Sequence, residues 1–351
     1  MRPRIFYTIS SLILAILFFT IIEVSAINLE ILQSELNFLP LIFNQQKPTP
    51  VPTQTPEPIT PGKLLLHFAD ESIVYNWFTY VPKNLNKSKP TYIWISGLHG
   101  NLVTDDYNQI TEESRSQAEG RTWLADDHQY ILLVPVIPRP QTDYVYVVAF
   151  SWKVFLESTP HFLQRPDEKI NLMIDKFTFD LRSDGYFIQD KVFIDGYSAG
   201  AMFSQRYTLL HPDRVQAAAA GQCGGAMTLP ESIYNETILE WPVGVSDLNI
   251  LAGFNFDKTS FVQVPQFIYI GDKDDTNSTL RGTGELWRTQ SQIDFLNNTF
   301  GNTDPIRLEN QVNYLNNLGY TNILFKMYPG IGHQIIPEMV NDTMAFFNAY
   351  K

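Results

Sequence analysis

The sequence has a single cysteine, Cys223, among its 351 residues. One cysteine excludes an intrachain disulfide, so the hydrophobic core of a chain this long has to stabilise the fold by itself. Cys223 lies among small residues, with neither a helix start nor a histidine beside it, and we interpret it as a buried residue rather than a nucleophile. No Cys-x-x-Cys or His-Glu-x-x-His motif occurs, and we therefore expect neither a metal nor a cofactor.

Positively charged residues are also scarce. Lysine and arginine number 25 against 37 aspartates and glutamates, which gives a net charge of −12, and the sequence has no basic run. A nucleic-acid partner is therefore not expected, and the negative charge favours solubility.

One long apolar run stands at the N-terminus. Residues 5–22 are almost wholly apolar, and Arg2 and Arg4 precede them. Val24 and Ala26 then occupy the −3 and −1 positions of a cleavage site, so we predict a signal peptide at 1–26. An uncleaved membrane anchor is the alternative, because the run is about as long as a bilayer requires. In both cases the rest of the chain is expected outside the cell or at its surface.

A proline-rich stretch follows. Six prolines lie among threonines between Lys47 and Gly62, which predicts an extended linker rather than a packed element. We therefore divide the chain into the signal peptide, an N-terminal segment with linker at 27–62, and one catalytic domain at 63–351.

Apolar runs and helical periodicities alternate within this domain. Strands are expected at 64–68, 73–81, 91–96, 130–136, 191–195, 215–220, 266–270 and 323–328, and helices at 111–127, 167–181, 201–210, 310–318 and 337–350. Continuously apolar strands separated by helices predict an α/β fold, with a mostly parallel sheet covered on both faces. Ligand sites in such sheets lie at the carboxyl ends of the strands.

Gly196-Tyr197-Ser198-Ala199-Gly200 is the most informative motif. It stands between an apolar strand and a helical run, which is the context of a nucleophile elbow. The two glycines would let strand and helix approach closely, and the sharp turn would present the Ser198 hydroxyl at the start of the helix. Ser198 is therefore the candidate nucleophile.

A serine hydroxyl needs a base and a residue that orients the base, and in this fold class the chain order is Ser, acid, His. Only His211 and His333 follow Ser198. His211 ends the helix after the elbow and is interpreted as a surface or capping residue. His333 stands in a glycine-rich loop after the last predicted strand, where a general base belongs.

The acid is expected after the strand 266–270, where Asp272, Asp274 and Asp275 are clustered. Asp274 is the first choice, Asp275 is the alternative, and Asp272 is expected to cap the turn. Three carboxylates could also indicate calcium, but the spacing lacks a full loop of ligands.

Acyl transfer also needs donors for the oxyanion. The Ala199 N–H is one candidate. The loop after the strand 91–96, with glycines at 97 and 100, should supply the other, Leu98 being the first choice and His99 the second.

These motifs resemble those of secreted α/β-hydrolases of the polyhydroxybutyrate depolymerase and feruloyl esterase type. The resemblance covers roughly residues 90–350 and also rests on the segments 211–215, 271–274 and 328–333. It implies the α/β-hydrolase fold, and the roles of nucleophile for Ser198, acid for Asp274 and base for His333. Two departures are the Ser96-Gly97 pair, where the family usually has His-Gly, and the lack of disulfides and of a polymer-binding domain.

Two insertions are expected at the rim of the site. The segment 144–155 contains Tyr144, Tyr146, Phe150, Trp152 and Phe155, which form either a binding wall or ordinary core. The segment 231–264, with Trp241, Phe254, Phe256 and Phe261, could form a small cap.

An apolar rim favours a small-molecule or polymeric ester as substrate, and we predict a secreted serine esterase that forms an acyl-enzyme. The alternatives are a serine peptidase of the same fold and a catalytically inactive hydrolase fold that serves as a binding module.

Overall fold

The computed structural model of the chain describes residues 58–97, 102–141, 147, 149–274 and 288–351. All of them belong to the unit Pro58–Lys351. The predicted signal peptide and most of the predicted linker lie outside the described residues. Within the described residues, no helix combines the length and apolar character that a membrane span requires.

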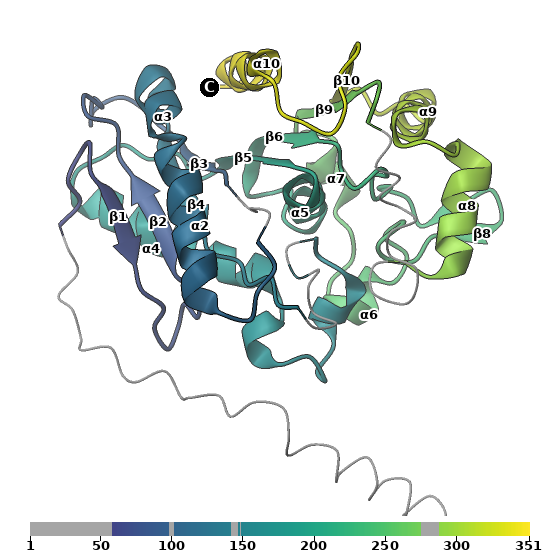
Figure 1. Cartoon of the computed structure of the whole chain (residues 1–351), viewed down its shortest axis with the longest axis horizontal. Helices are drawn as coiled ribbons and strands as arrows, with labels where there is room; N and C mark the ends of the chain where they lie inside the picture. Colours follow the sequence, from purple (N-terminus) through teal and green to yellow (C-terminus); the bar gives the residue numbers. More distant parts are fainter. Residues whose placement is uncertain (1–57, 98–101, 142–146, 148, 275–287) are drawn as a thin grey trace, which may run out of the picture. The chain divides into compact units, whose positions relative to one another are not determined.

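An eight-stranded sheet runs through this unit in the order β1-β2-β4-β3-β5-β6-β9-β10 (Figure 1). Its strands are β1 (Leu64–His67), β2 (Trp77–Tyr80), β3 (Ile93–Ile95), β4 (Ile131–Pro135), β5 (Val192–Tyr197), β6 (Val215–Gly221), β9 (Gln266–Gly271) and β10 (Ile323–Tyr328). Only β2 runs antiparallel to its neighbours, and the other pairings are parallel. The mostly parallel sheet predicted from the sequence is confirmed.

Helices cover both faces of the sheet, each against its own hydrophobic core. One core includes α4 (Pro166–Ser183), α5 (Ala199–Leu210), α8 (Gln290–Phe300) and α9 (Asp304–Asn317), and the other α2 (Tyr107–Glu119), α3 (Thr122–His128) and α10 (Pro337–Asn348). Because side chains alternate along a strand, Val192 and Ile194 of β5 enter the first core and Phe193 the second. Both faces of β5 are therefore apolar.

Several predicted elements differ from the observed ones. The helix expected at 111–127 is two helices, α2 and α3, separated at Gly120, which caps α2. The strand expected from residue 73 begins only at Trp77. The helix expected at 310–318 begins six residues earlier, at Asp304, with Pro305 in its first turn. Helix α8 was not expected, although Thr289 and Gln292 form a capping box at its start.

The segment expected to form the cap contains short elements. The strands β7 (Ile233–Tyr234) and β8 (Thr237–Ile238) form a separate hairpin, followed by α6 (Leu248–Leu251) and α7 (Lys258–Phe261). Trp241 and Phe261 are buried in the core, whereas Phe254 and Phe256 are partly exposed. The two buried rings therefore serve packing.

Candidate active site

Ser198 links β5 directly to α5 in a strained conformation. Its φ of 57° and ψ of −121° lie in a region that non-glycine residues rarely adopt. The Ser198 N–H donates to the Gly221 carbonyl at the end of neighbouring β6, at 2.8 Å. The strand, the strained serine and the helix are the local structure that the Gly-x-Ser-x-Gly motif predicts.

Gly196 permits this turn because the helix passes directly over it. A Cβ at Gly196 would lie 2.2 Å from the carbonyl carbon and oxygen of Gly200 and 2.7 Å from the Ala201 nitrogen. All three are backbone atoms, which no rotamer change can move aside. The close approach of β5 and α5 therefore depends on glycine at this position.

Asp274 and His333 form a direct pair. The Nδ1 atom of His333 lies 3.0 Å from Asp274 Oδ2 and 3.2 Å from Oδ1. The Asp274 side chain is fully buried, while the His333 side chain is 34% exposed. A buried carboxylate on Nδ1 leaves Nε2 as the imidazole nitrogen available for proton exchange.

Hydrogen bonds between the loops after β9 and β10 hold this pair. Lys273 N–H donates to the Ile331 carbonyl at 2.9 Å, and Gly330 N–H donates to Asp272 Oδ1 at 2.6 Å. Gly271 is required at the crossing, because a Cβ there would lie 2.1 Å from the Ile331 oxygen. Asp272 thus caps the turn that leads to His333.

Tyr197 connects this pair to the elbow. Its ring centroid lies 5.2 Å from that of His333, and its hydroxyl donates to the Gln334 carbonyl at 3.2 Å. Burial and the negative charge of Asp274 raise the pKa of Tyr197, so its hydroxyl remains a donor at neutral pH. Between the described residues Ser198 and His333 themselves there is no hydrogen bond. The structure therefore joins Asp274 to His333 directly, and joins the residue before Ser198 to the His333 loop.

Of the two candidate oxyanion donors, only Ala199 lies within the described residues. Ala199 is the first residue of α5, where an N–H has no partner within the helix. Leu98 and the alternative His99 lie outside the described residues, as does Asp275, the alternative acid. Gly97, which begins the loop, has a φ of 65°, and a Cβ at this position would lie 3.1 Å from the Val134 side chain and 3.3 Å from that of Gln117.

A partly buried polar network surrounds Asp195 of β5, and the sequence did not predict it. Asp195, three residues before Ser198, accepts from Trp94 Nε1 at 2.8 Å and from the Ser96 hydroxyl, which itself accepts from Arg121 Nε at 2.8 Å. Burial raises the pKa of Asp195, and the charge of Arg121 and the hydrogen bonds oppose this rise. The network ties the end of β3 to β5. A charged residue within an apolar strand was the signal that could have revealed it.

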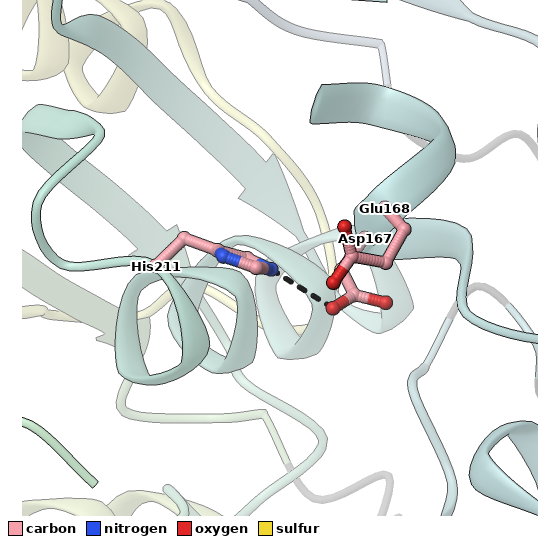
Figure 2. A group of neighbouring side chains, drawn as sticks. All are labelled: Asp167, Glu168 and His211. Carbon is pink, nitrogen blue, oxygen red and sulfur yellow. Dashed lines mark hydrogen bonds and ion pairs between the residues drawn. The ribbon is translucent and has the colours of Figure 1, made fainter. Parts of the chain in front are cut away.

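Asp167, Glu168 and His211 form a second acid–histidine group (Figure 2). His211 Nε2 lies 2.8 Å from Asp167 Oδ2, and Arg165 pairs with the same oxygen at 2.7 Å and with Glu168 at 2.5 Å. Burial opposes ionisation of Asp167, but the hydrogen bonds from His211 and Arg165 outweigh it and lower the pKa of Asp167. Although these three residues are spaced like metal ligands, Arg165 already provides the cation for both carboxylates.

This group corrects the expectation for His211. His211 occupies the capping position of α5, as expected, but only 9% of the residue is exposed, so it is not a surface residue. Its ring bonds the carboxylate at the start of α4, which the local sequence does not reveal because 44 positions separate the two residues.

The aromatic segment expected at the rim is only partly described. Tyr144 and Tyr146 lie outside the described residues. Phe150 is fully buried, and its ring lies 5.3 Å from Phe203 and 6.3 Å from Trp241. Phe155, in the short helix η1 (Trp152–Phe155), also packs on Trp241. Phe150 therefore belongs to the core, which was the alternative to a binding wall, whereas Phe155 is partly buried and packs against that core.

The sheet order, the helices on both faces and the strained serine after β5 define the α/β-hydrolase fold. Two solved structures have this fold in common with the chain. Poly(aspartic acid) hydrolase-1 from Sphingomonas sp. KT-1 superposes with a TM-score of 0.52 at 18% identity, over 82% of this chain and 97% of that one. A poly(3-hydroxybutyrate) depolymerase from Bordetella parapertussis gives a TM-score of 0.51 at 16% identity, over 82% and 89%. No protein-family model and no curated protein matches the sequence.

Proposed function

We propose that the chain is a secreted serine hydrolase that cleaves carboxylic esters through an acyl-enzyme intermediate. The observation that carries the proposal is the hydrogen-bonded pair of the buried Asp274 with His333, in the loops after β9 and β10, on the same sheet as the strand β5 that precedes the strained Ser198. All three residues follow the carboxyl ends of parallel strands, where ligand sites of such sheets lie.

The proposed roles follow from these contacts. His333 accepts the Ser198 proton at Nε2 while the Ser198 oxygen attacks the ester carbonyl carbon. Asp274 holds Nδ1–H and stabilises the imidazolium that forms. The Ala199 N–H, at the positive end of the α5 dipole, stabilises the oxyanion, and we propose the Leu98 N–H as the second donor. His333 then returns the proton to the leaving alcohol, and water repeats the sequence to release the acid.

The charge of the chain bears on its substrate. The two structural neighbours are named for action on poly(aspartic acid) and on poly(3-hydroxybutyrate). The net charge of −12 disfavours binding of a polyanion at neutral pH, and this supports a neutral ester as substrate.

The test is fluorophosphonate labelling combined with a series of aryl and aliphatic esters and a parallel series of peptides. We expect labelling and ester hydrolysis by the wild type, and loss of both in Ser198→Ala and of turnover in His333→Ala, by several orders of magnitude. Ser183→Ala, which removes a hydroxyl on an exposed turn of α4, is the control. Cleavage of peptides in preference to esters would indicate a peptidase, and unlabelled but folded wild type would indicate a binding module.

A further inference from the structure

Three arginines of one core are buried and take no part in the proposed reaction. Arg206 of α5, Arg288 before α8 and Arg307 of α9 are each at most 1% exposed. Fully buried arginines are rare unless they are paired, because burial of an uncompensated charge costs several kcal/mol. The positive charges of these three guanidinium groups therefore need compensating groups in the core.

The three guanidinium groups gather on one short segment after β6. Arg307 donates to the Gly225 carbonyl at 2.8 Å, and Arg288 donates to the Ala226 carbonyl at 3.2 Å. Arg206 donates from Nε to the Thr228 hydroxyl at 3.0 Å. Three cations from distant parts of the sequence thus surround four consecutive residues.

The charges of this cluster do not balance. One buried carboxylate, Asp304, pairs with Arg307 at 2.8 Å. Cys223 lies near Arg206 and Arg288, but burial raises its pKa to about 12, so the thiol is neutral. Burial and the charge of Arg307 lower the pKa of Arg288 to about 10, which still leaves Arg288 charged at neutral pH. Burial and the charge of Arg288 also lower the pKa of Arg206, but a guanidinium stays protonated in proteins, so within the described residues three positive charges face one negative charge.

Hydrogen bonding is incomplete as well. Arg206 Nη2, Arg288 Nε, Arg288 Nη1 and Arg307 Nε are buried and have no hydrogen-bond partner among the described residues. A cation–π contact of Arg206 with Trp241, at 5.7 Å, compensates only part of one charge. Native proteins rarely leave several charged donors unsatisfied in one place.

We propose that Arg206, Arg288 and Arg307 bind a small monovalent anion of the halide class inside the core. A spherical anion accepts hydrogen bonds from several directions, so one ion can serve donors on different side chains. It also removes one of the two excess positive charges. The near-complete burial of all three arginines excludes a large ligand at this position.

Bromide in crystals of the wild-type protein is the direct probe. Anomalous scattering should give a bromide peak within hydrogen-bonding distance of Arg288 Nε or Nη1. The absence of a peak, or a carboxylate of the chain itself bonded to these nitrogens, would overturn the proposal.

Thermal unfolding at constant ionic strength tests the same site in solution, with chloride exchanged for the much larger gluconate. We expect chloride to raise Tm saturably, by roughly 5 °C at saturation, because an ion that binds only the folded state stabilises it by mass action. Arg288→Met should lose this dependence. Arg182→Met, which changes a half-exposed arginine, should keep it. Equal Tm values of the wild type in chloride and gluconate would refute the site, whatever the fate of the proposed enzymatic activity.

Discussion

Replacement of Gly196 by alanine tests the geometry of the elbow. The added Cβ would lie 2.2 Å from backbone atoms of Gly200, so β5 and α5 have to separate by about 1.2 Å to reach the 3.4 Å of ordinary contact. Overpacking of a core costs up to about 3 kcal/mol, and we expect this upper value because only backbone can yield. A shift of about 1 Å at Ser198 should also lower kcat/KM roughly 100-fold in the molecules that still fold.

The assay combines urea unfolding with kcat/KM on a soluble aryl ester. Gly185→Ala is the matched control, because Gly185 has a φ of 83° but nothing within 4 Å of an added Cβ. It should cost only about 1–2 kcal/mol of backbone strain and leave kcat/KM unchanged. If Gly196→Ala matched the wild type in both measurements, the close approach of β5 and α5 would not be what sets the position of Ser198.

Three further substitutions address the site and its surroundings. Asp274→Asn should lower kcat about 10⁴-fold, since the amide no longer holds the required tautomer of His333; a larger loss in Asp275→Asn would transfer the acid's role to that residue. Tyr197→Phe removes the hydroxyl that bonds the His333 loop and should reduce kcat roughly 10-fold with little change in KM, whereas an unchanged kcat would show that the ring alone positions the loop. Asp167→Asn should lower the free energy of unfolding by about 3–5 kcal/mol at neutral pH, because it breaks a buried ion pair. The pKa of Asp167 is lowered on folding, so its contribution is present above the pKa of the unfolded chain and is lost as pH falls through the folded value. Denaturant titrations at neutral and acidic pH should therefore show the gap between mutant and wild type closing, and a constant gap would refute the assignment.

Much of the sheet could be predicted because its strands are apolar on both faces. The runs that form β4 and β9 are buried throughout, the run before Ser198 is buried over its first half, and their length and flanking turns identify them. Helix boundaries were less predictable. The interruption at Gly120 depends on how two helices pack on the sheet, and α8 carries its signal in two polar residues outside the apolar pattern.

In the candidate site too, some residues could be predicted from the sequence and others could not. Ser198, Asp274 and His333 follow strands, and the parallel order of those strands places such residues at one edge, so their positions could be predicted from the chain order. The network around Asp195 could not, because its partners Ser96 and Arg121 come from the residue after β3 and the residue that caps α3. The pairing of His211 with Asp167 and the three buried arginines likewise depend on tertiary contacts between distant segments.

The order of the strands separates two events that are often equated, inactivation and unfolding. His333 follows β10, which is the outermost strand and is paired only with β9 in the described sheet, whereas Ser198 follows β5 in the interior. Edge elements open at a lower free energy than the centre of a sheet. A local opening of β10 would carry the proposed base away from the nucleophile while most of the core stays closed. Activity should then decline on heating before the main loss of tertiary structure, and backbone amides of β10 should exchange with deuterium faster than those of β5.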